Sequence, residues 1–470
     1  MKFSRNVRTA IAIYLAALLA YGAASGQRLR GHTNDNHYVR LADGWLHRRL
    51  DLGAAPGTMD DRADIETLWL KDGRVLRGAM VFGTSQAFRT MRDGIVNVTP
   101  EEIERRQSQY YVSFPPFPAL LMLPFVALWG LETNDVLFNI LIAALAPALL
   151  FLLLRRLRTR EASQRTFCED LWLTALLGVG SVFYYSAVIG QVWYTAHVVS
   201  VVLVLLYVMA ALDARYPFAA GLCLVCGFLC RPEILFAAPL FLWELARVHS
   251  RPREGEAPQG FLPQLRDRWH RFDRAAALRT LLRFGAPIAV VGLAAAAHNI
   301  VRFGRPTEFG HTFLNVRWKE RIQHYGLFNY TFLGRNLACM LALTPKIIAG
   351  WPYVQTSHHG LALWVTSPAL LYLLWPQVKG PLHRPLWLTT ACMAIPDLLY
   401  QNSGWIQFGY RFSLDYMVLL VCLLAIGGRP MTRWFKFWII AGVAVNLFGA
   451  ITFGQAPQFS FEGYFPPGIE

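Results

Sequence analysis

Apolar runs of about 14 to 21 residues recur along the whole chain and constrain its fold more than any other feature. A helix of about 20 apolar residues is long enough to cross a bilayer. Charged residues make up only 16% of the 470 residues, whereas soluble domains carry about 25%. So few charges cannot cover the surface of a soluble protein, and we expect an all-α polytopic membrane protein.

We expect eleven transmembrane helices in a single membrane domain, residues 1–470. The first run follows Lys2, Arg5 and Arg8 and ends without a clear signal-peptidase site, which indicates an uncleaved span. The expected spans are Thr9–Ser25, Asn134–Leu154, Glu169–Ile189, Trp193–Leu212, Pro217–Cys230, Ile234–Arg247, Arg283–Val301, Leu361–Trp375, Pro385–Gln401, Phe412–Gly427 and Trp434–Gly454.

The run Phe117–Leu131 is placed at the outer interface, because it is short and is interrupted by two prolines. Omitting it from the count puts the basic stretches 155–165 and 248–282 in the cytoplasm, while the tail 455–470 contains no Lys or Arg. The positive-inside rule then predicts a cytoplasmic N-terminus and an outside C-terminus. We interpret the net charge of +15 as the excess of basic residues that orients the helices in the membrane and contacts anionic lipids, not as a sign of nucleic-acid binding.

Two long outer segments remain, 26–133 and 302–360, and long loops often carry function. In the first, Tyr38, Leu41, Ala42, Trp45 and Leu46 have the spacing of an amphipathic helix lying on the membrane. A second interfacial helix is expected in the other outer segment, over Asn336–Gly350.

A small mixed α/β element is also expected in the first outer segment. Alternation over Glu66–Val81 around Lys71-Asp72-Gly73-Arg74 predicts a hairpin. Thr99-Pro100-Glu101-Glu102 has the pattern of a helix start, with a Thr cap and Pro at the first position.

No cofactor or metal is expected. The seven cysteines lie mostly in apolar runs, and Cys223, Cys226 and Cys230 are interpreted as helix-packing residues. The outer loops contain no Asp-x-Asp pattern, and the chain has no Walker loop, Rossmann fingerprint or His-Glu-x-x-His pattern.

Six segments follow one another in a particular order after the first span. They are Asp35-Asn36-His37-Tyr38-Val39-Arg40-Leu41-Ala42, the Tyr-x-Ser-x-Pro-Pro-x-Pro segment Tyr111–Pro118, Arg231-Pro232-Glu233, Asn299–Pro306, Thr366-Ser367-Pro368 and Phe408–Phe412. Their order resembles the GT-C superfamily of integral-membrane glycosyltransferases, most of all the bacterial branch related to protein mannosyltransferases and the lipid A aminoarabinose transferase. The resemblance implies a GT-C-like fold and a sugar on a polyprenyl phosphate as donor.

The resemblance also implies a catalytic role for Asp35, because such enzymes use an acidic residue of the first outer loop near the acceptor. A carboxylate there could deprotonate an acceptor hydroxyl. The alternative is that Asp35 caps the following helix. Relatives often carry a second acidic residue at the head of the fourth span, where this chain has His197; it could carry a proton, or it could be a packed histidine.

A leaving lipid phosphate needs cations at the outer face, and Arg231 is the first candidate. The runs on either side of it, Pro217–Cys230 and Ile234–Arg247, each reach only about 21 Å of the roughly 30 Å core. Arg231 therefore falls at a buried helical break, where an Arg is either functional or paired, here with Glu233. Arg411 is the second candidate. Arg335 and Lys346 come third and could instead contact lipid headgroups.

The expected function is transfer of a sugar from a polyprenyl-phosphate carrier to a glycan, lipid or protein acceptor on the periplasmic face of a bacterial inner membrane. Nucleotide sugars are not expected as donors. A flippase or transporter of polyprenyl-linked saccharides is the first alternative, which internal repeats and midplane polar residues would favour. The second is a polymerase or ligase of lipid-linked glycans.

Overall fold

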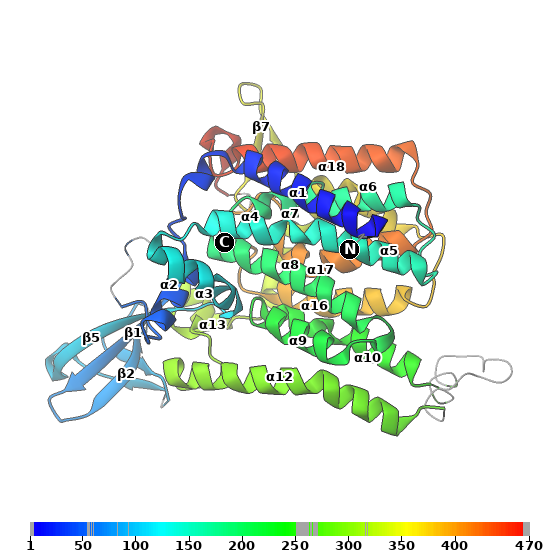
Figure 1. Cartoon of the computed structure of the whole chain (residues 1–470). Coiled ribbons are helices and arrows are strands. Elements are labelled where there is room, and N and C mark those ends of the chain that lie inside the picture. The colour runs from blue at the N-terminus through cyan, green and yellow to red at the C-terminus, as the bar shows by residue number, and fades with distance from the viewer. Residues whose placement is uncertain are drawn as a thin grey trace.

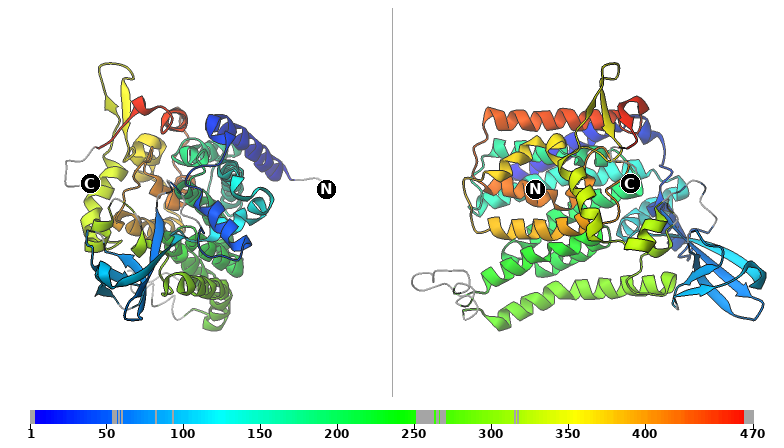
Figure 2. Two further views of the ribbon diagram at one scale, coloured as in Figure 1. Left: turned by 90° about the vertical axis from the view of Figure 1, so that its left-hand side faces the viewer. Right: turned by 180° about the vertical axis from the view of Figure 1, so that it is seen from behind.

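The structure is a computed structural model that describes residues 4–463, except 54–56, 58, 60, 82, 93, 251–262, 264–265, 267–270, 315 and 317. Most long helices lie side by side along one direction, and a small sheet projects from one end of this bundle (Figure 1). The view from behind shows the same division (Figure 2). The helices are α1 Arg5–Ser25, α2 His37–Leu46, α3 Phe117–Trp129, α4 Asp135–Ala143, α5 Leu145–Thr159, α6 Phe167–Gly178, α7 Phe183–Ala187, α8 Val192–Ala211, α9 Pro217–Phe228, α10 Ala238–Val248, α12 Arg274–Phe303, α13 Lys319–Tyr325, α14 Leu333–Leu341, α15 Leu363–Thr366, α16 His383–Leu399, α17 Leu414–Ile426 and α18 Arg433–Thr452.

Five helical stretches in the described part of the chain are long and apolar enough to cross a membrane. They are Arg5–Arg30, Asp135–Thr159, Val192–Ala214, Arg274–Phe303 and Arg433–Thr452. Long apolar helices on this scale indicate a helical membrane protein.

The other six expected spans also coincide with helical structure, but they are shorter or interrupted. Glu169–Ile189 divides into α6 and α7, and Leu361–Trp375 divides into α15 and a 3₁₀ turn that begins at Pro368. A proline cannot donate a backbone hydrogen bond, which explains why the regular helix ends before that position.

Helix α3, which covers the run left out of the expected spans, begins and ends at the same end of the bundle. The Phe117 amide donates to Leu229 O at 2.9 Å, at the break after α9. Beyond α3, the Asn134 side chain donates to Leu29 O at 2.8 Å, just after α1. These contacts place both ends of α3 at the sheet end of the bundle.

Contacts between distant segments show which loops share an end of the bundle. Arg5 lies over the Phe167 ring at 4.4 Å, so the start of α1 is at the end that carries the loop between α5 and α6. At the other end, strand β8 (Ser460–Phe461) pairs in parallel with β7 (Val354–Ser357). The last described residues therefore lie on the same side as the outer segment 302–360.

The first outer segment forms a five-stranded sheet of order β4-β3-β2-β1-β5. The predicted hairpin is confirmed: β1 and β2 pair antiparallel across the turn at 71–74. Thr99 begins a helical turn as predicted, with Pro100 at its first position and a capping box to Glu102, but the helix is a single 3₁₀ turn. The chain continues as a strand because β5 pairs with the whole of β1. The strands are β1 Arg62–Leu70, β2 Val75–Met80, β3 Ala87–Thr90, β4 Ile95–Asn97, β5 Ile103–Val112 and, in the second outer segment, β6 Lys346–Ile347.

The predicted amphipathic helix is α2, and its apolar side is buried inside the protein. Tyr38, Leu41 and Ala42 are buried in one cluster with Met122 of α3 and Val199 of α8. The apolar stripe that suggested a membrane surface thus packs on neighbouring helices. In the second outer segment, α14 covers only the first part of the expected interfacial helix, and the chain then forms β6.

Candidate functional site

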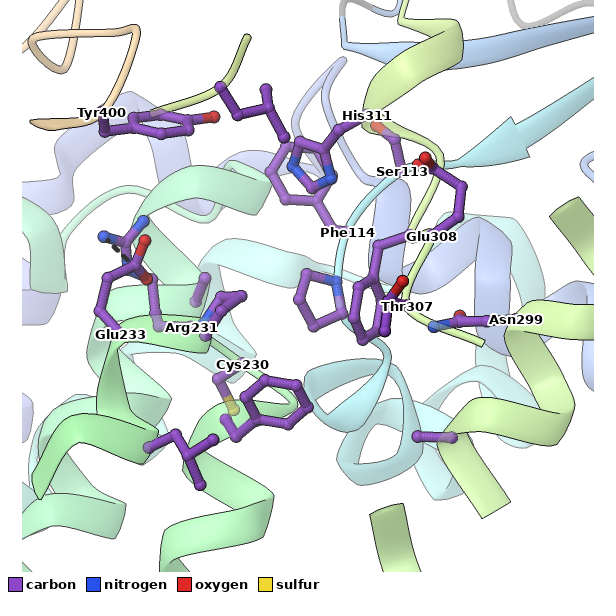
Figure 3. Close-up of a pocket in the computed structure, with 18 of the residues that line it drawn as sticks. Ser113, Phe114, Cys230, Arg231, Glu233, Asn299, Thr307, Glu308, His311 and Tyr400 are labelled. Carbon is purple, nitrogen blue, oxygen red and sulfur yellow. Dashed lines mark ion pairs between the residues drawn. The ribbon is translucent and has the colours of Figure 1, made fainter. Parts of the chain in front are cut away.

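A cavity of about 630 Å³ lies at the sheet end of the bundle. One wall is the face of α12 that carries Ile288, Gly292 and Ala295, and it is apolar. The opposite side holds Arg231 and Glu233, which face Glu308 and Asn299 across the space (Figure 3). The cavity therefore has an apolar stretch along α12 and charged side chains on both sides, Arg231 and Glu233 facing Glu308.

Arg231 reaches the cavity because the helix stops just before it. Helix α9 ends at Phe228, Arg231 is extended with φ −142° and ψ 113°, and Pro232 starts a 3₁₀ helix through Ala237. This is the predicted buried break, and it directs the guanidinium between the helices.

Three buried carboxylates converge on a single nitrogen of Arg231. Its Nη2 lies 2.7 Å from Asp415 Oδ2, 3.1 Å from Asp397 Oδ1 and 3.5 Å from Glu233 Oε2. The expected pairing with Glu233 is present, but it is the longest of the three contacts. The three carboxylates have the spacing of a metal site, and Arg231 Nη2 sits among them where a metal cation would be.

Asp397 and Asp415 were missed by the sequence reasoning. Each lies inside an expected span, on α16 and on α17. Acidic residues within membrane helices are rare and usually functional or paired, and that signal could have identified both.

His197, on α8, also belongs to this charged group. Its Nδ1 lies 3.1 Å from Asp415 Oδ1, and its ring lies against Phe412. The side chain is buried and also lines the cavity. The structure therefore joins two predicted site residues, His197 and Arg231, through one aspartate.

Arg411 lines the same cavity in a different environment. It is only 5% exposed, its Nη1 donates to Gly404 O at 2.9 Å, and its Nε has no hydrogen-bond partner. The guanidinium lies near the rings of Tyr194 and Phe412, at 5.3 and 5.5 Å. Among the described residues, no carboxylate lies within 4.0 Å of it. Arg411 is thus a buried cation without an ion pair.

A carboxylate from the first outer segment, Asp61, faces this cavity. Trp193 Nε1 donates to Asp61 Oδ2 at 2.7 Å, and the Ser113 hydroxyl donates to Asp61 O at 2.5 Å. Asp61 has φ +52°, a left-handed conformation that costs free energy for a residue with a side chain. Such strained positions cluster at functional sites. The sequence reasoning did not single it out.

Asp35, the predicted catalytic residue, is not among the residues that line the cavity. Gln191 Nε2 donates to Asp35 Oδ2 at 2.8 Å, and the Val192 amide donates to Asp35 O at 3.2 Å. The N-cap of α2 is Asn36. Asp35 therefore sits beside the start of α8, close to Trp193, which does line the cavity. Its catalytic role stays a prediction.

Arg335 and Lys346 also lie outside the cavity lining. Arg335, on α14, is buried and donates through Nη2 to Gln401 O. Lys346, on β6, is exposed, and its Nζ lies 5.3 Å from the centre of the Phe461 ring.

Two residues near the end of α12 fix the rim of the cavity. Arg302 is fully buried, and its Nη1 donates to Val112 O at 2.9 Å, just before Ser113. Asn299 accepts from Arg302 at 3.0 Å and donates to Pro306 O at 3.0 Å. Hydrogen bonds from the end of α12 therefore hold both the segment 26–133, at Val112, and the segment 302–360, at Pro306.

The second outer segment adds a carboxylate and an imidazole to the cavity. Glu308 accepts from Gly310 N at 2.6 Å and from the Thr312 hydroxyl at 2.5 Å, so its own loop holds it in place. Burial lowers the pKa of His311, which keeps this ring neutral at neutral pH.

The site therefore combines a buried cation, several carboxylates and an apolar wall. A cation of this kind can bind a phosphate, a carboxylate can accept a proton, and the wall can hold a hydrocarbon chain. Comparison of the chain with protein-family models, curated proteins and solved structures gives no match.

Proposed function

We propose that this protein is a GT-C-type glycosyltransferase that uses a polyprenyl-phosphate sugar as donor. The observation that carries the proposal is Arg411, a buried guanidinium without an ion pair that opens into a cavity with an apolar wall. A buried cation without a counter-ion is costly, and a bound anion removes that cost. A lipid phosphate supplies both the anion and the apolar chain.

In this proposal the donor phosphate lies against Arg411 and the polyprenyl chain runs along α12. Gly292, Ala295 and Ala296 have small side chains or none on that face of α12, which leaves room for a polyprenyl chain. The carboxylates of Asp397 and Asp415 already neutralise the charge of Arg231. In the proposal Arg231 therefore holds the helices beside the cavity in place, and Arg411 binds the phosphate.

The chemistry is a displacement at the anomeric carbon. An acceptor oxygen forms a bond to that carbon while the bond to the phosphate oxygen breaks, and its electron pair leaves with the lipid phosphate. The acceptor proton goes to a carboxylate. Asp61 is the candidate that lines the cavity, and Asp35 is the candidate that the resemblance implies. Arg411 stabilises the charge that develops on the leaving phosphate.

The acceptor is a glycan, a lipid or a protein with a free hydroxyl, and the proposed reaction needs no separate cofactor. We further propose eleven spans in a bacterial inner membrane, with the sheet and the C-terminus on the periplasmic side. Two observations support this count: both ends of α3 lie at the same end of the bundle, and β8 pairs with β7.

Release of polyprenyl phosphate by the purified protein tests the proposal. We expect release that depends on both a polyprenyl-phosphate sugar and an acceptor. Translocation of the lipid-linked sugar, without release for any donor and acceptor pair, would instead identify a flippase.

A further inference from the structure

Two arginines and a histidine of the outer segment 302–360 lie next to residues that line the cavity. Arg321 is on α13, Arg335 is on α14 and His359 follows β7. None of the three lines the cavity, although Trp318 and Gln401, which contact them, do.

Each member of this basic cluster, Arg321, Arg335 and His359, is held by a different neighbour. The Arg335 guanidinium donates to Gln401 O and lies 5.6 Å from the centre of the Phe332 ring. Arg321 lies 6.0 Å from the centre of the Trp318 ring. His359 Nδ1 lies 3.0 Å from Ser403 Oγ. Arg335 and His359 therefore both contact the stretch 401–403, and Tyr325, at the end of α13, packs 6.1 Å from the Phe332 ring that Arg335 also faces.

The cluster contains two guanidinium groups without a counter-ion. In the described part of the chain, neither Arg321 nor Arg335 has a carboxylate within 4.0 Å. Arg335 is only 8% exposed, and the Nε atoms of both arginines are buried without a hydrogen-bond partner. Burying two cations together is unfavourable unless an anion joins them.

Burial and the neighbouring charges both lower pKa values in this cluster. Burial and the nearby charge of Arg335 lower the pKa of Arg321 to about 10. Burial and then the charges of Arg335, His358 and Arg321 lower the pKa of His359 to about 4. Burial, with a smaller contribution from the positive charges beside it, thus keeps the imidazole neutral at neutral pH.

We propose that Arg321, Arg335 and His359 form a second anion site, which binds a phosphate-type oxyanion. Guanidinium groups donate paired hydrogen bonds to phosphate oxygens, and the neutral imidazole and the Gln401 side chain can add hydrogen bonds. The phosphate comes either from an anionic lipid headgroup or from a soluble phosphate. The site lies apart from Arg411 and does not depend on transferase activity.

The test uses inorganic phosphate and the full-length protein in detergent, in an Arg411→Gln background so that the cavity cation does not contribute. We expect Arg321→Gln or Arg335→Gln to weaken phosphate binding roughly tenfold to a hundredfold in calorimetry, as expected for loss of a charge-assisted hydrogen bond. Arg74→Gln, which removes an exposed arginine of the hairpin turn, is the matched control and should change nothing.

The source of the phosphate is distinguished in lipid nanodiscs. A phosphatidylglycerol adduct that survives native mass spectrometry in the parent protein and is lost in Arg335→Gln assigns the site to a headgroup. Phosphate binding without such an adduct assigns it to a soluble phosphate. Equal phosphate affinity in all variants, with no change in adducts, overturns the proposal. If Arg335→Gln does not fold, the half-buried Arg321→Gln decides: weaker phosphate binding supports the site, and unchanged binding overturns it.

Discussion

Two nitrogens of the Arg231 guanidinium donate hydrogen bonds to Asp415 Oδ2, Nε at 3.1 Å and Nη2 at 2.7 Å. This pair joins the break after α9 to the first turn of α17. Arg231 is therefore held by the protein itself, and it differs in this respect from Arg411, which has no ion pair among the described residues.

Breaking this pair should destabilise the protein more than breaking the longer contacts of Arg231. We expect Asp415→Asn to lower the free energy of unfolding by about 3 kcal/mol, the lower end for a buried pair, because other carboxylates remain. Asp397→Asn should cost less, and Glu233→Gln least, in the order of their distances. Thermal unfolding in detergent measures all three, with Asp72→Asn in the exposed hairpin pair as a control that should have no effect. A larger effect of Glu233→Gln would contradict this ranking.

Arg411→Gln should reduce turnover by about 10² to 10³ and weaken donor binding much less. The reason is that the guanidinium stabilises charge that appears only as the glycosidic bond breaks. Arg411→Lys should recover only part of the rate, because an ammonium lacks the planar two-pronged geometry. Release of polyprenyl phosphate and equilibrium donor binding are the two measurements. Equal losses in both would show that Arg411 binds the donor without favouring the transition state.

Asp61→Asn should lower turnover by roughly 10² to 10⁴ with little change in donor binding, as expected when a positioned base is removed. The Trp193 hydrogen bond can persist to an amide oxygen, so the fold should not change. Asp35→Asn is the paired comparison, and we expect a smaller loss because Asp35 does not line the cavity. A larger loss for Asp35→Asn would instead support the role implied by the resemblance.

A reporter of membrane sidedness should locate the hairpin and the C-terminus on the outer side. We expect activity of an outside-specific reporter inserted at 71–74 or fused after Glu470, and an inside signal from the basic loop 251–275. Opposite signals from the hairpin and the C-terminus would contradict the count of eleven spans.

Acid should destabilise the protein between about pH 6.5 and pH 4, in part through His359. The folded-state pKa of His359 is about 4, whereas an unfolded histidine titrates near 6.5. In that interval the unfolded state binds more protons, so stability falls as the pH falls. Melting temperature measured against pH in phosphate-free buffer should fall less steeply for His359→Gln. The control His47→Gln changes an exposed side chain and should keep the parent's slope.

Local patterns predicted local structure well. The hairpin turn at 71–74 and the break at Arg231 depend on neighbouring residues only, and both are present. Each expected span coincides with helical structure, although only five stretches meet the length of a full crossing.

What the sequence did not reveal depends on contacts between distant residues. Asp397 and Asp415 meet Arg231 across more than 160 residues of chain, at separations of 166 and 184. No local spacing reports such a meeting. The apolar stripe of α2 likewise fits a lipid surface or a protein surface, and only the packing against α3 distinguishes them.

The pairing of β7 with β8 has a consequence for how the protein is made. Translation delivers Ser460 and Phe461 after every described helix, so β7 has no parallel neighbour until α18 has been synthesised. An unpaired strand edge is a recognised liability, because other chains can add to it. A copy that is truncated before β8 thus keeps an unpaired β7 edge, and this edge distinguishes an unfinished chain from a finished one.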